Sequence, residues 1–154
     1  MKKLLKSHTM GFEPWGVVLF IAIMLPNILW MLVPAPVDVL RKPSVTPVTD
    51  GLGSFFQMLM AFCLCAICRT DAKPVRLSPI IWAVIGCVAL YWVAWACYYA
   101  GITHAVLLMA MALLPCAAFV LFLIQRRNWI GLAPAVAFTV CHLLFAIVNH
   151  LVKR

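Results

Sequence analysis

The sequence predicts an all-α membrane protein built as a bundle of five transmembrane helices. Hydrophobic residues make up 66% of its 154 residues and charged residues only 10%, whereas soluble domains are about 45–50% apolar and about 25% charged. The apolar residues fall into runs of about 17 residues or more, near the length that a helix needs to cross a bilayer. These runs contain no Lys, Arg, Asp or Glu. We therefore expect residues 1–154 to form a single integral membrane domain.

Five spans are predicted, at residues 15–33, 51–68, 80–99, 104–124 and 129–152. The first begins at Trp15, and we expect it to stay uncleaved, because the polar stretch before it is long for a signal peptide. Pro26 lies past the centre of this span, where it frees a backbone carbonyl that a neighbouring helix must satisfy.

The loops before the second and third spans carry distinct signals. Residues 34–50 form the longest predicted loop, which is rich in proline and should be ordered only if it docks on the helices. Asp50 is the predicted N-cap of the second span, which is short for a membrane crossing. A basic loop, residues 69–76, leads to Ser78 and Pro79, a favourable N-cap and first helical residue for the third span.

The basic residues predict the orientation of the bundle. The connection at residues 100–103 is so short that the third and fourth spans must be antiparallel neighbours. If the N-terminus is cytoplasmic and the C-terminus outside, eight basic residues face inward and four outward, which agrees with the positive-inside rule. The inner set is Lys2, Lys3, Lys6, Arg69, Lys73, Arg76, Arg126 and Arg127, and the outer set is Arg41, Lys42, Lys153 and Arg154.

The net charge of +8 would suggest a nucleic-acid partner in a soluble protein. Here the basic residues lie between apolar runs, so membrane topology and anionic lipid explain them better. The expected partners are the lipid bilayer, a small-molecule ligand, and a second copy of the chain or another membrane protein. Nucleic acid is not an expected partner.

His142 is the polar centre of the fifth span. A titratable side chain at that depth is costly and is by default a functional-site hypothesis. Helical spacing places small and polar residues on the same face of the span, namely Ala135, Thr139, Ala146 and Asn149. This face is expected to point into the bundle.

Other polar residues are predicted at a similar depth, in the outer half of the bilayer or at its outer edge: Asn27, Gln57, Tyr91 and His104. Gln57 lies on a second stripe of small and polar residues, with Asp50, Gly53, Ser54, Ala61, Cys65 and Cys68. Small residues let helices approach closely and polar ones bond across the interface, so we expect the two stripes to face each other. Two interpretations stay open. Either Asn27, Gln57 and His142 hydrogen-bond with one another and lock the bundle, or the polar side chains bind a ligand or ion in a pocket open to the outer side.

The other motifs do not support a chemical site. Cys65 and Cys68 form a CxxC pair near Cys63, but they lie at the C-terminal end of a predicted helix, where the helix dipole disfavours a thiolate. No His accompanies these three cysteines to complete a four-ligand zinc site, and no span carries a carboxylate pair. We therefore predict no catalytic residue, metal ligand or cofactor, and an enzyme is the less favoured class.

Two resemblances are seen. The segments Leu25–Ile28, Leu90–Trp95, Leu113–Phe119 and Phe138–His142 together resemble a group of small five-helix membrane proteins of Gram-positive bacteria with no established function, which implies a bacterial plasma membrane. The five spans and the long first loop also resemble the TspO, or tryptophan-rich sensory, family, whose loop motif is partly matched by Lys42, Pro43 and Pro47. Val45 stands where that family has Trp, so its porphyrin and sterol ligands are not carried over to this chain.

Two classes of function follow. In the first, the protein binds or passes a small ligand through a polar pocket in the outer half of the bundle, without catalysis. In the second, it is a structural or accessory subunit whose basic inner loops engage anionic lipid or a partner protein.

Overall fold

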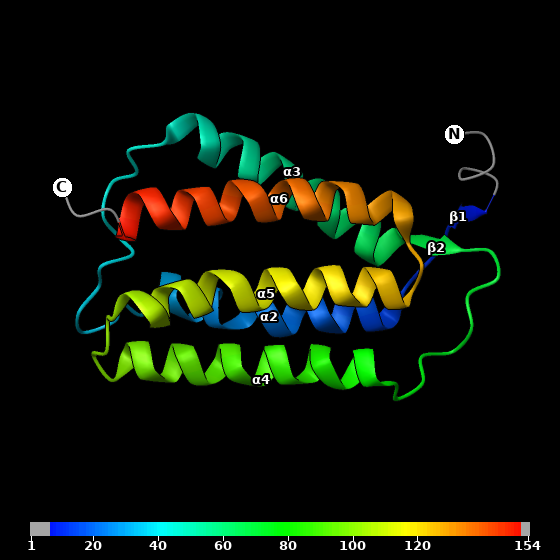
Figure 1. Ribbon diagram of the computed structural model, residues 1–154, viewed down its shortest axis with the longest axis horizontal. Coiled ribbons are helices and arrows are strands. Elements are labelled where there is room, and N and C mark those ends of the chain that lie inside the picture. Colours follow the sequence, from blue (N-terminus) through cyan, green and yellow to red (C-terminus); the bar gives the residue numbers. More distant parts are fainter. Residues whose placement is uncertain (1–6, 152–154) are drawn as a thin grey trace.

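The computed structural model describes residues 7–151, and five long helices account for most of them (Figure 1). The long helices are α2 (Pro14–Leu32), α3 (Pro47–Ala66), α4 (Pro79–Tyr99), α5 (Ala105–Gln125) and α6 (Trp129–Ala146). Two short strands, β1 (His8–Met10) and β2 (Ile67–Arg69), and a π-helix, η1 (Ile147–Leu151), complete the described elements. Each long helix is long and apolar enough to cross a membrane. The prediction of an all-α, multi-pass bundle of five helices is therefore confirmed.

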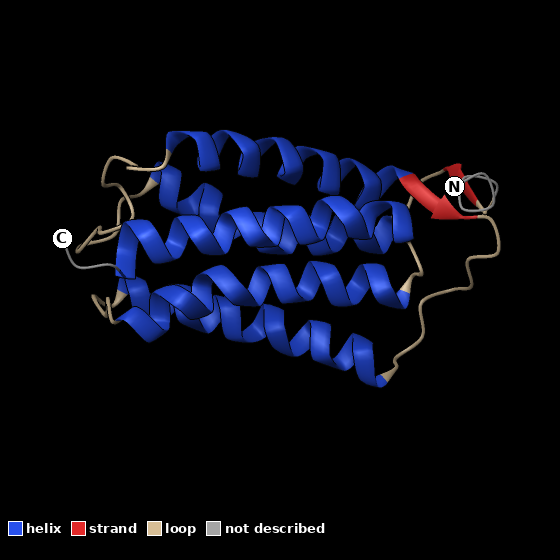
Figure 2. Ribbon diagram, turned by 45° about the horizontal axis from the view of Figure 1, so that its top comes forward, coloured by secondary structure: helices blue, strands red, loops and turns tan. Residues whose placement is uncertain are grey.

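The helices form a closed ring in which sequence neighbours are not always spatial neighbours. α3 packs on α6, α6 on α5, and α5 on α4, while α2 contacts α3, α4 and α5. All five helices run roughly along the long axis of the molecule, and α3 is inclined across α6 (Figures 1 and 2). Side chains from several helices fill the centre, and the largest fully buried ones include Tyr98, Phe119, Met60 and Leu64.

The second span differs most from its prediction. It was expected at residues 51–68 with Asp50 as its N-cap, but α3 begins at Pro47 with Thr46 as the N-cap residue. Proline is favoured in the first turn because its missing N–H has no helical partner there, and Asp50 instead lies inside that turn, where the helix dipole favours a carboxylate. The predicted start of the third span is confirmed, since the Ser78 side chain accepts a hydrogen bond from the Ile81 amide at 3.3 Å.

The kink residue Pro26 shows how the bundle satisfies a freed carbonyl. Proline cannot donate to the residue four positions earlier, so the carbonyl of Ala22 lacks its helical partner. The indole Nε1 of Trp92, on α4, donates to this carbonyl at 2.9 Å. The expected rescue by a neighbouring helix is thus observed, and it joins α2 to α4.

The segment before α2 forms a feature that the sequence did not indicate. β1 pairs antiparallel with β2, with His8 opposite Arg69. The pairing continues beyond the strands, because the amides of Gly11 and Glu13 donate to the carbonyls of Ala66 and Cys65 at 3.0 and 2.9 Å. The last carbonyls of a helix have no partner within it, so this segment caps the end of α3.

A buried ion pair fixes the same end of the bundle, which we call the Glu13 end. Glu13 is only 6% exposed, and Arg126 donates to its carboxylate from Nε at 2.8 Å. The Arg126 guanidinium also donates to the carbonyl of Lys73 at 2.6 Å. Asn128 lies beside them, and its side-chain amide donates to the carbonyls of Cys63 and Ile67 at 2.8 Å each. The turn between α5 and α6 is therefore tied to the end of α3 and to the segment before α2.

The loops alternate between two ends of the bundle as the sequence predicts. Residues 67–78 and 126–128 lie at the Glu13 end, and residues 33–46 and 100–104 lie at the opposite end (Figure 1). Five residues used to predict the orientation lie outside the described part of the chain: Lys2, Lys3, Lys6, Lys153 and Arg154. So does the predicted end of the fifth span at Val152. Which end faces the cytoplasm stays a prediction.

Candidate functional site

A pocket of about 190 Å³ lies between α3 and α6 in the half of the bundle opposite the Glu13 end. Its walls combine polar and aromatic side chains from the two helices: Thr49, Asp50, Gly53, Ser54, Gln57, Phe138, Cys141, His142 and Phe145. The α3 residues fall within the first three turns of that helix, so at about 1.5 Å per residue the pocket reaches roughly 15 Å below the helix start. This depth corresponds to about half of a hydrocarbon core.

Two of the predicted site residues, Gln57 and His142, meet in this pocket. The stripes that carry them face each other, as expected from their small residues. Gly53 is buried, and a β-carbon at that position would lie 3.5 Å from the Cβ of Cys141 on α6. That distance is an ordinary van der Waals contact, so the backbone of α3 at Gly53 packs closely on α6 beside the pocket.

The polar groups of the pocket have spare hydrogen-bonding capacity. Within the described part of the chain, the His142 ring makes no hydrogen bond and stacks on Phe138, with the ring centres 5.1 Å apart. The Gln57 amide reaches only the sulfur of Met24, a weak acceptor, at 3.7 Å. Polar groups at such depth normally have partners, so the pocket is suited to hold water or a polar ligand.

Asn27 and Tyr91 lie elsewhere. The Asn27 side chain donates to the Tyr91 hydroxyl at 2.7 Å and to the Ile23 carbonyl at 2.9 Å. Tyr91 is 3% exposed, so the pair forms a buried link between α2 and α4. Neither residue lines the pocket, and no hydrogen bond joins Asn27, Gln57 and His142 to one another. The interpretation in which these three lock the bundle together is therefore wrong.

His104 is also separate from the pocket. It is the N-cap residue of α5, but its exposed side chain makes no capping hydrogen bond. It lies at the end of the loop that joins α4 to α5, which agrees with its predicted place at the start of the fourth span. The pocket brings together two of the five predicted ligand-binding residues, and Asp50, Ser54 and Phe138 line it with them.

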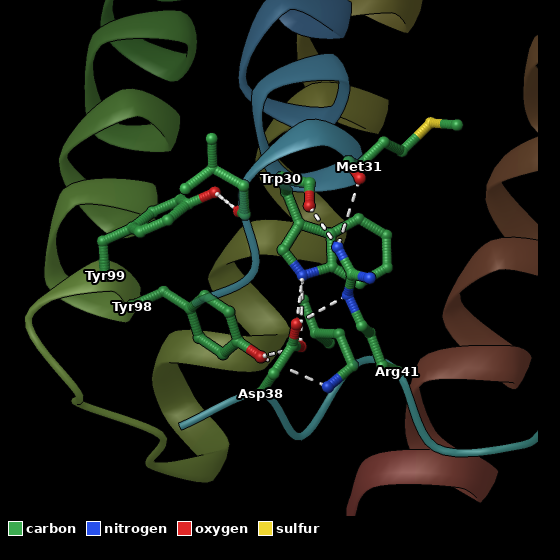
Figure 3. Close-up of polar contacts among 8 residues, drawn as sticks. Trp30, Met31, Asp38, Arg41, Tyr98 and Tyr99 are labelled. Carbon is green, nitrogen blue, oxygen red and sulfur yellow. Dashed lines mark hydrogen bonds and ion pairs between the residues drawn. The ribbon is translucent and has the colours of Figure 1, made fainter. Parts of the chain in front are cut away.

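A second polar cluster, at the end opposite Glu13, is centred on Asp38 (Figure 3). The Asp38 carboxylate accepts from the Trp30 indole at 2.9 Å and from the Tyr98 hydroxyl at 2.9 Å. Arg41 forms an ion pair with the same carboxylate at 2.9 Å and places its guanidinium 5.1 Å from the centre of the Trp30 ring. The sequence signal for this cluster was slight: one of four acidic residues in the chain, three positions before an arginine.

The Asp38 cluster docks the proline-rich loop on the helices. Tyr99 donates to the Val33 carbonyl at 2.6 Å, next to the start of the loop (Figure 3). At the other end of the loop, the Asn149 side chain accepts from the Val45 amide and donates to the Thr46 hydroxyl, both at 2.8 Å. The loop is therefore ordered by contacts with α4 and with η1, just beyond the pocket.

The Asp38 carboxyl has an unusual acidity. Partial burial alone would raise its pKa. The hydrogen bonds from Tyr98 and Trp30 and the charge of Arg41 together outweigh this effect, so the pKa is lowered from the ordinary value of 3.8. Stabilisation from a carboxyl with a depressed pKa is complete above the unfolded-state value and is lost as the pH falls through the folded-state value.

Asp38→Asn should therefore destabilise the protein at neutral pH and much less in acid. We expect a loss of about 1.5–3 kcal/mol at pH 7, since the hydrogen bonds lost are to a charged group. The difference from the wild type should shrink as the pH falls below about 4, where the unfolded-state carboxyl begins to be protonated, and should vanish below the lowered folded-state pKa. Thermal unfolding of both proteins in detergent, followed by tryptophan fluorescence over this pH range, measures the difference. A difference that stays constant with pH would contradict the role assigned to the charge.

The cysteine cluster of Cys63, Cys65 and Cys68 lies at the end of α3 and in β2. All seven cysteines are free thiols. Burial raises the pKa of the Cys68 thiol, and the nearby Glu13 carboxylate raises it further, against a smaller effect of Arg126. A raised pKa disfavours the thiolate that redox exchange needs. Among residues 7–151, no three His, Cys, Asp or Glu side chains gather in a way that could hold a metal ion.

Comparisons of the chain with protein-family models, curated proteins and solved structures found no match. The two resemblances described above stay predictions. The functional interpretation therefore depends on the geometry of the pocket and of the bundle ends.

Proposed function

We propose that this multi-pass membrane protein binds or passes a small ligand through the pocket between α3 and α6. The observation that carries the proposal is the set of polar groups in the pocket walls without protein partners, above all the His142 ring. We also propose that the pocket opens to the outer side of a bacterial plasma membrane, with the N-terminus cytoplasmic and the C-terminus outside. The distribution of basic residues supports this orientation.

The alternative is an accessory subunit. Its support is at the Glu13 end, where Lys73, Arg76 and Arg127 are exposed. Juxtamembrane cations of this kind attract anionic lipid, at about 1 kcal/mol for each residue near the surface. This alternative predicts that pocket substitutions change the assembly of the protein with its partner and have no effect on small molecules.

The two functions are distinguished by pocket substitutions. The wild type in lipid nanodiscs is heated with each of a panel of aromatic alcohols, amines and acids of benzene to indole size. We expect at least one compound to raise the melting temperature. His142→Leu should stay folded, because Leu suits the membrane interior, and should lose the response. His142→Asn should keep part of it, since an amide replaces one hydrogen bond.

Two further variants control for position. Ser54→Trp places a large side chain in the pocket and should abolish the response. Val140→Trp lies on an exposed face of α6 outside the pocket lining and should respond like the wild type. If no compound stabilises the wild type, or if Ser54→Trp and His142→Leu respond fully, the ligand-binding proposal fails and the accessory role replaces it.

A further inference from the structure

Asp50 differs from the other acidic residues of the chain. The sequence has four acidic residues, and three of them form ion pairs with arginine: Glu13 with Arg126, Asp38 with Arg41, and Asp71 with Arg69. Within the part of the chain that the structure describes, Asp50 pairs with no cationic side chain. Its only side-chain hydrogen bond with another described residue is a long one from the Thr46 hydroxyl, at 3.5 Å.

The unpaired carboxylate lies in the wall of the pocket. No Lys or Arg is among the lining residues, so Asp50 supplies the only fixed charge there. Phe138 and Phe145 add aromatic side chains to the lining, and aromatic rings attract organic cations through the ring quadrupole. The pocket thus combines a carboxylate, aromatic walls and uncharged hydrogen-bonding groups, in a protein whose net charge is otherwise strongly positive.

We infer that the ligand of this pocket is a small organic cation, an amine whose ammonium group pairs with Asp50 and whose apolar part lies against Phe138 and Phe145. The inference rests on the proposed ligand-binding function and adds the chemical class of the ligand. A cation supplies the partner that Asp50 lacks, whereas an anion would meet an unpaired carboxylate at the mouth of the pocket. His142 and Gln57, deeper in the pocket, are placed to bond a second polar group of the ligand.

The volume limits the size of the amine. An engineered cavity of about 150 Å³ in another protein holds one benzene molecule, and this pocket measures about 190 Å³. A single aromatic ring with a one- or two-carbon amine arm therefore fits. Larger polycyclic cations exceed the pocket unless the helices separate.

Three probes of nearly the same shape and different charge test the inference: benzylamine, benzyl alcohol and benzoate. Their binding to the wild type in nanodiscs of zwitterionic lipid is measured by calorimetry at neutral pH. Benzyl alcohol controls for partition of the ring into lipid. We expect benzylamine to bind at least tenfold more tightly than benzyl alcohol, and benzoate more weakly than both. This comparison needs no variant, so it does not depend on the folding of one.

Two matched variants then test whether Asp50 is the carboxylate that pairs with the ammonium group. Asp50→Asn should bring the affinity for benzylamine down to that for benzyl alcohol. Asp71→Asn changes the net charge equally but removes an exposed carboxylate outside the pocket lining, and it should bind all three probes like the wild type. The order of the three affinities separates ligand binding by Asp50 from its structural effect. If Asp50 only stabilised the first turn of α3, Asp50→Asn would change stability and leave the order of affinities unchanged.

The outcomes distinguish failure of the cation inference from failure of the ligand-binding function. Equal affinity of the wild type for benzylamine and benzyl alcohol, or unchanged benzylamine binding by Asp50→Asn, overturns the cation inference and leaves the ligand-binding function standing. Absence of binding by all three probes overturns the cation inference. The ligand-binding function fails with it if no compound of the wider panel raises the melting temperature of the wild type, or if Ser54→Trp responds to the panel as the wild type does.

Discussion

Gly16→Ala is expected to unfold the Glu13 end of the bundle. A β-carbon at this position would lie 2.3 Å from the carbonyl oxygen of Leu64 and 3.1 Å from its carbon. The obstacle is backbone, so no side-chain rotation relieves it, and α2 must move away from α3. This movement breaks the hydrogen bonds by which Gly11 and Glu13 cap α3. We expect a loss of stability of about 3 kcal/mol or more, at the upper end for overpacking.

The measurement is thermal unfolding of the purified protein in detergent, together with the fraction that elutes as a single species. Gly86→Ala is the matched control, since the same substitution in α4 meets no atom within 4 Å. Alanine has a higher helix propensity than glycine, by about 1 kcal/mol, so the control should be neutral or stabilising. A Gly16→Ala protein as stable as this control would show that α2 and α3 are not in close contact.

Arg126→Gln should be nearly as damaging, for an electrostatic reason. The substitution leaves the Glu13 carboxylate, only 6% exposed, without its cationic partner. Removal of one member of a buried ion pair costs about 3–5 kcal/mol, because the remaining charge is desolvated and uncompensated. The loss is measured as a fall in melting temperature and as easier proteolysis of the loop at residues 67–78, which Arg126 holds through the Lys73 carbonyl.

A double-mutant cycle isolates the charge. Glu13→Gln combined with Arg126→Gln removes both charges, and we expect it to recover much of the stability that the single arginine variant loses. Arg69→Gln serves as a control at the same end, since its partner Asp71 is exposed and surface pairs contribute about 0–1 kcal/mol. A double variant less stable than Arg126→Gln would contradict the interpretation that the stranded carboxylate is the cause.

The helices could be predicted because their signal is local. Runs of apolar residues long enough to cross a bilayer define α2 to α6, and Ser78 with Pro79 marks a start that depends only on neighbouring residues. The start of α3 was missed by four residues because Pro47 and Asp50 are both acceptable in a first turn, and sequence alone does not decide between them.

The candidate site was predictable only in part, for a related reason. Gln57 and His142 could be placed in one pocket because each lies on a helical stripe of small residues, and such stripes mark close helix contacts. Asn27 shares their predicted depth but bonds Tyr91 on α4, and depth alone does not give the direction of a side chain. The Asp38 cluster and the strand pair of His8–Met10 with Ile67–Arg69 depend on contacts between loops and distant elements. Short, irregular segments of this kind carry no periodic signal.

The ion pair between Glu13 and Arg126 also has a consequence for the order in which the bundle can be completed during synthesis. The two residues are separated by 113 positions in the chain, which at about 5–20 residues per second takes a ribosome roughly 6–23 s. Through this interval α2 is already made, while the cation that pairs with Glu13 is not. Until Arg126 is made, the Glu13 carboxylate at the start of α2 has no cationic partner and must stay in contact with water, because a buried unpaired charge is costly. Burial of Glu13 thus belongs to the last stage of assembly, after the turn between α5 and α6 has been made.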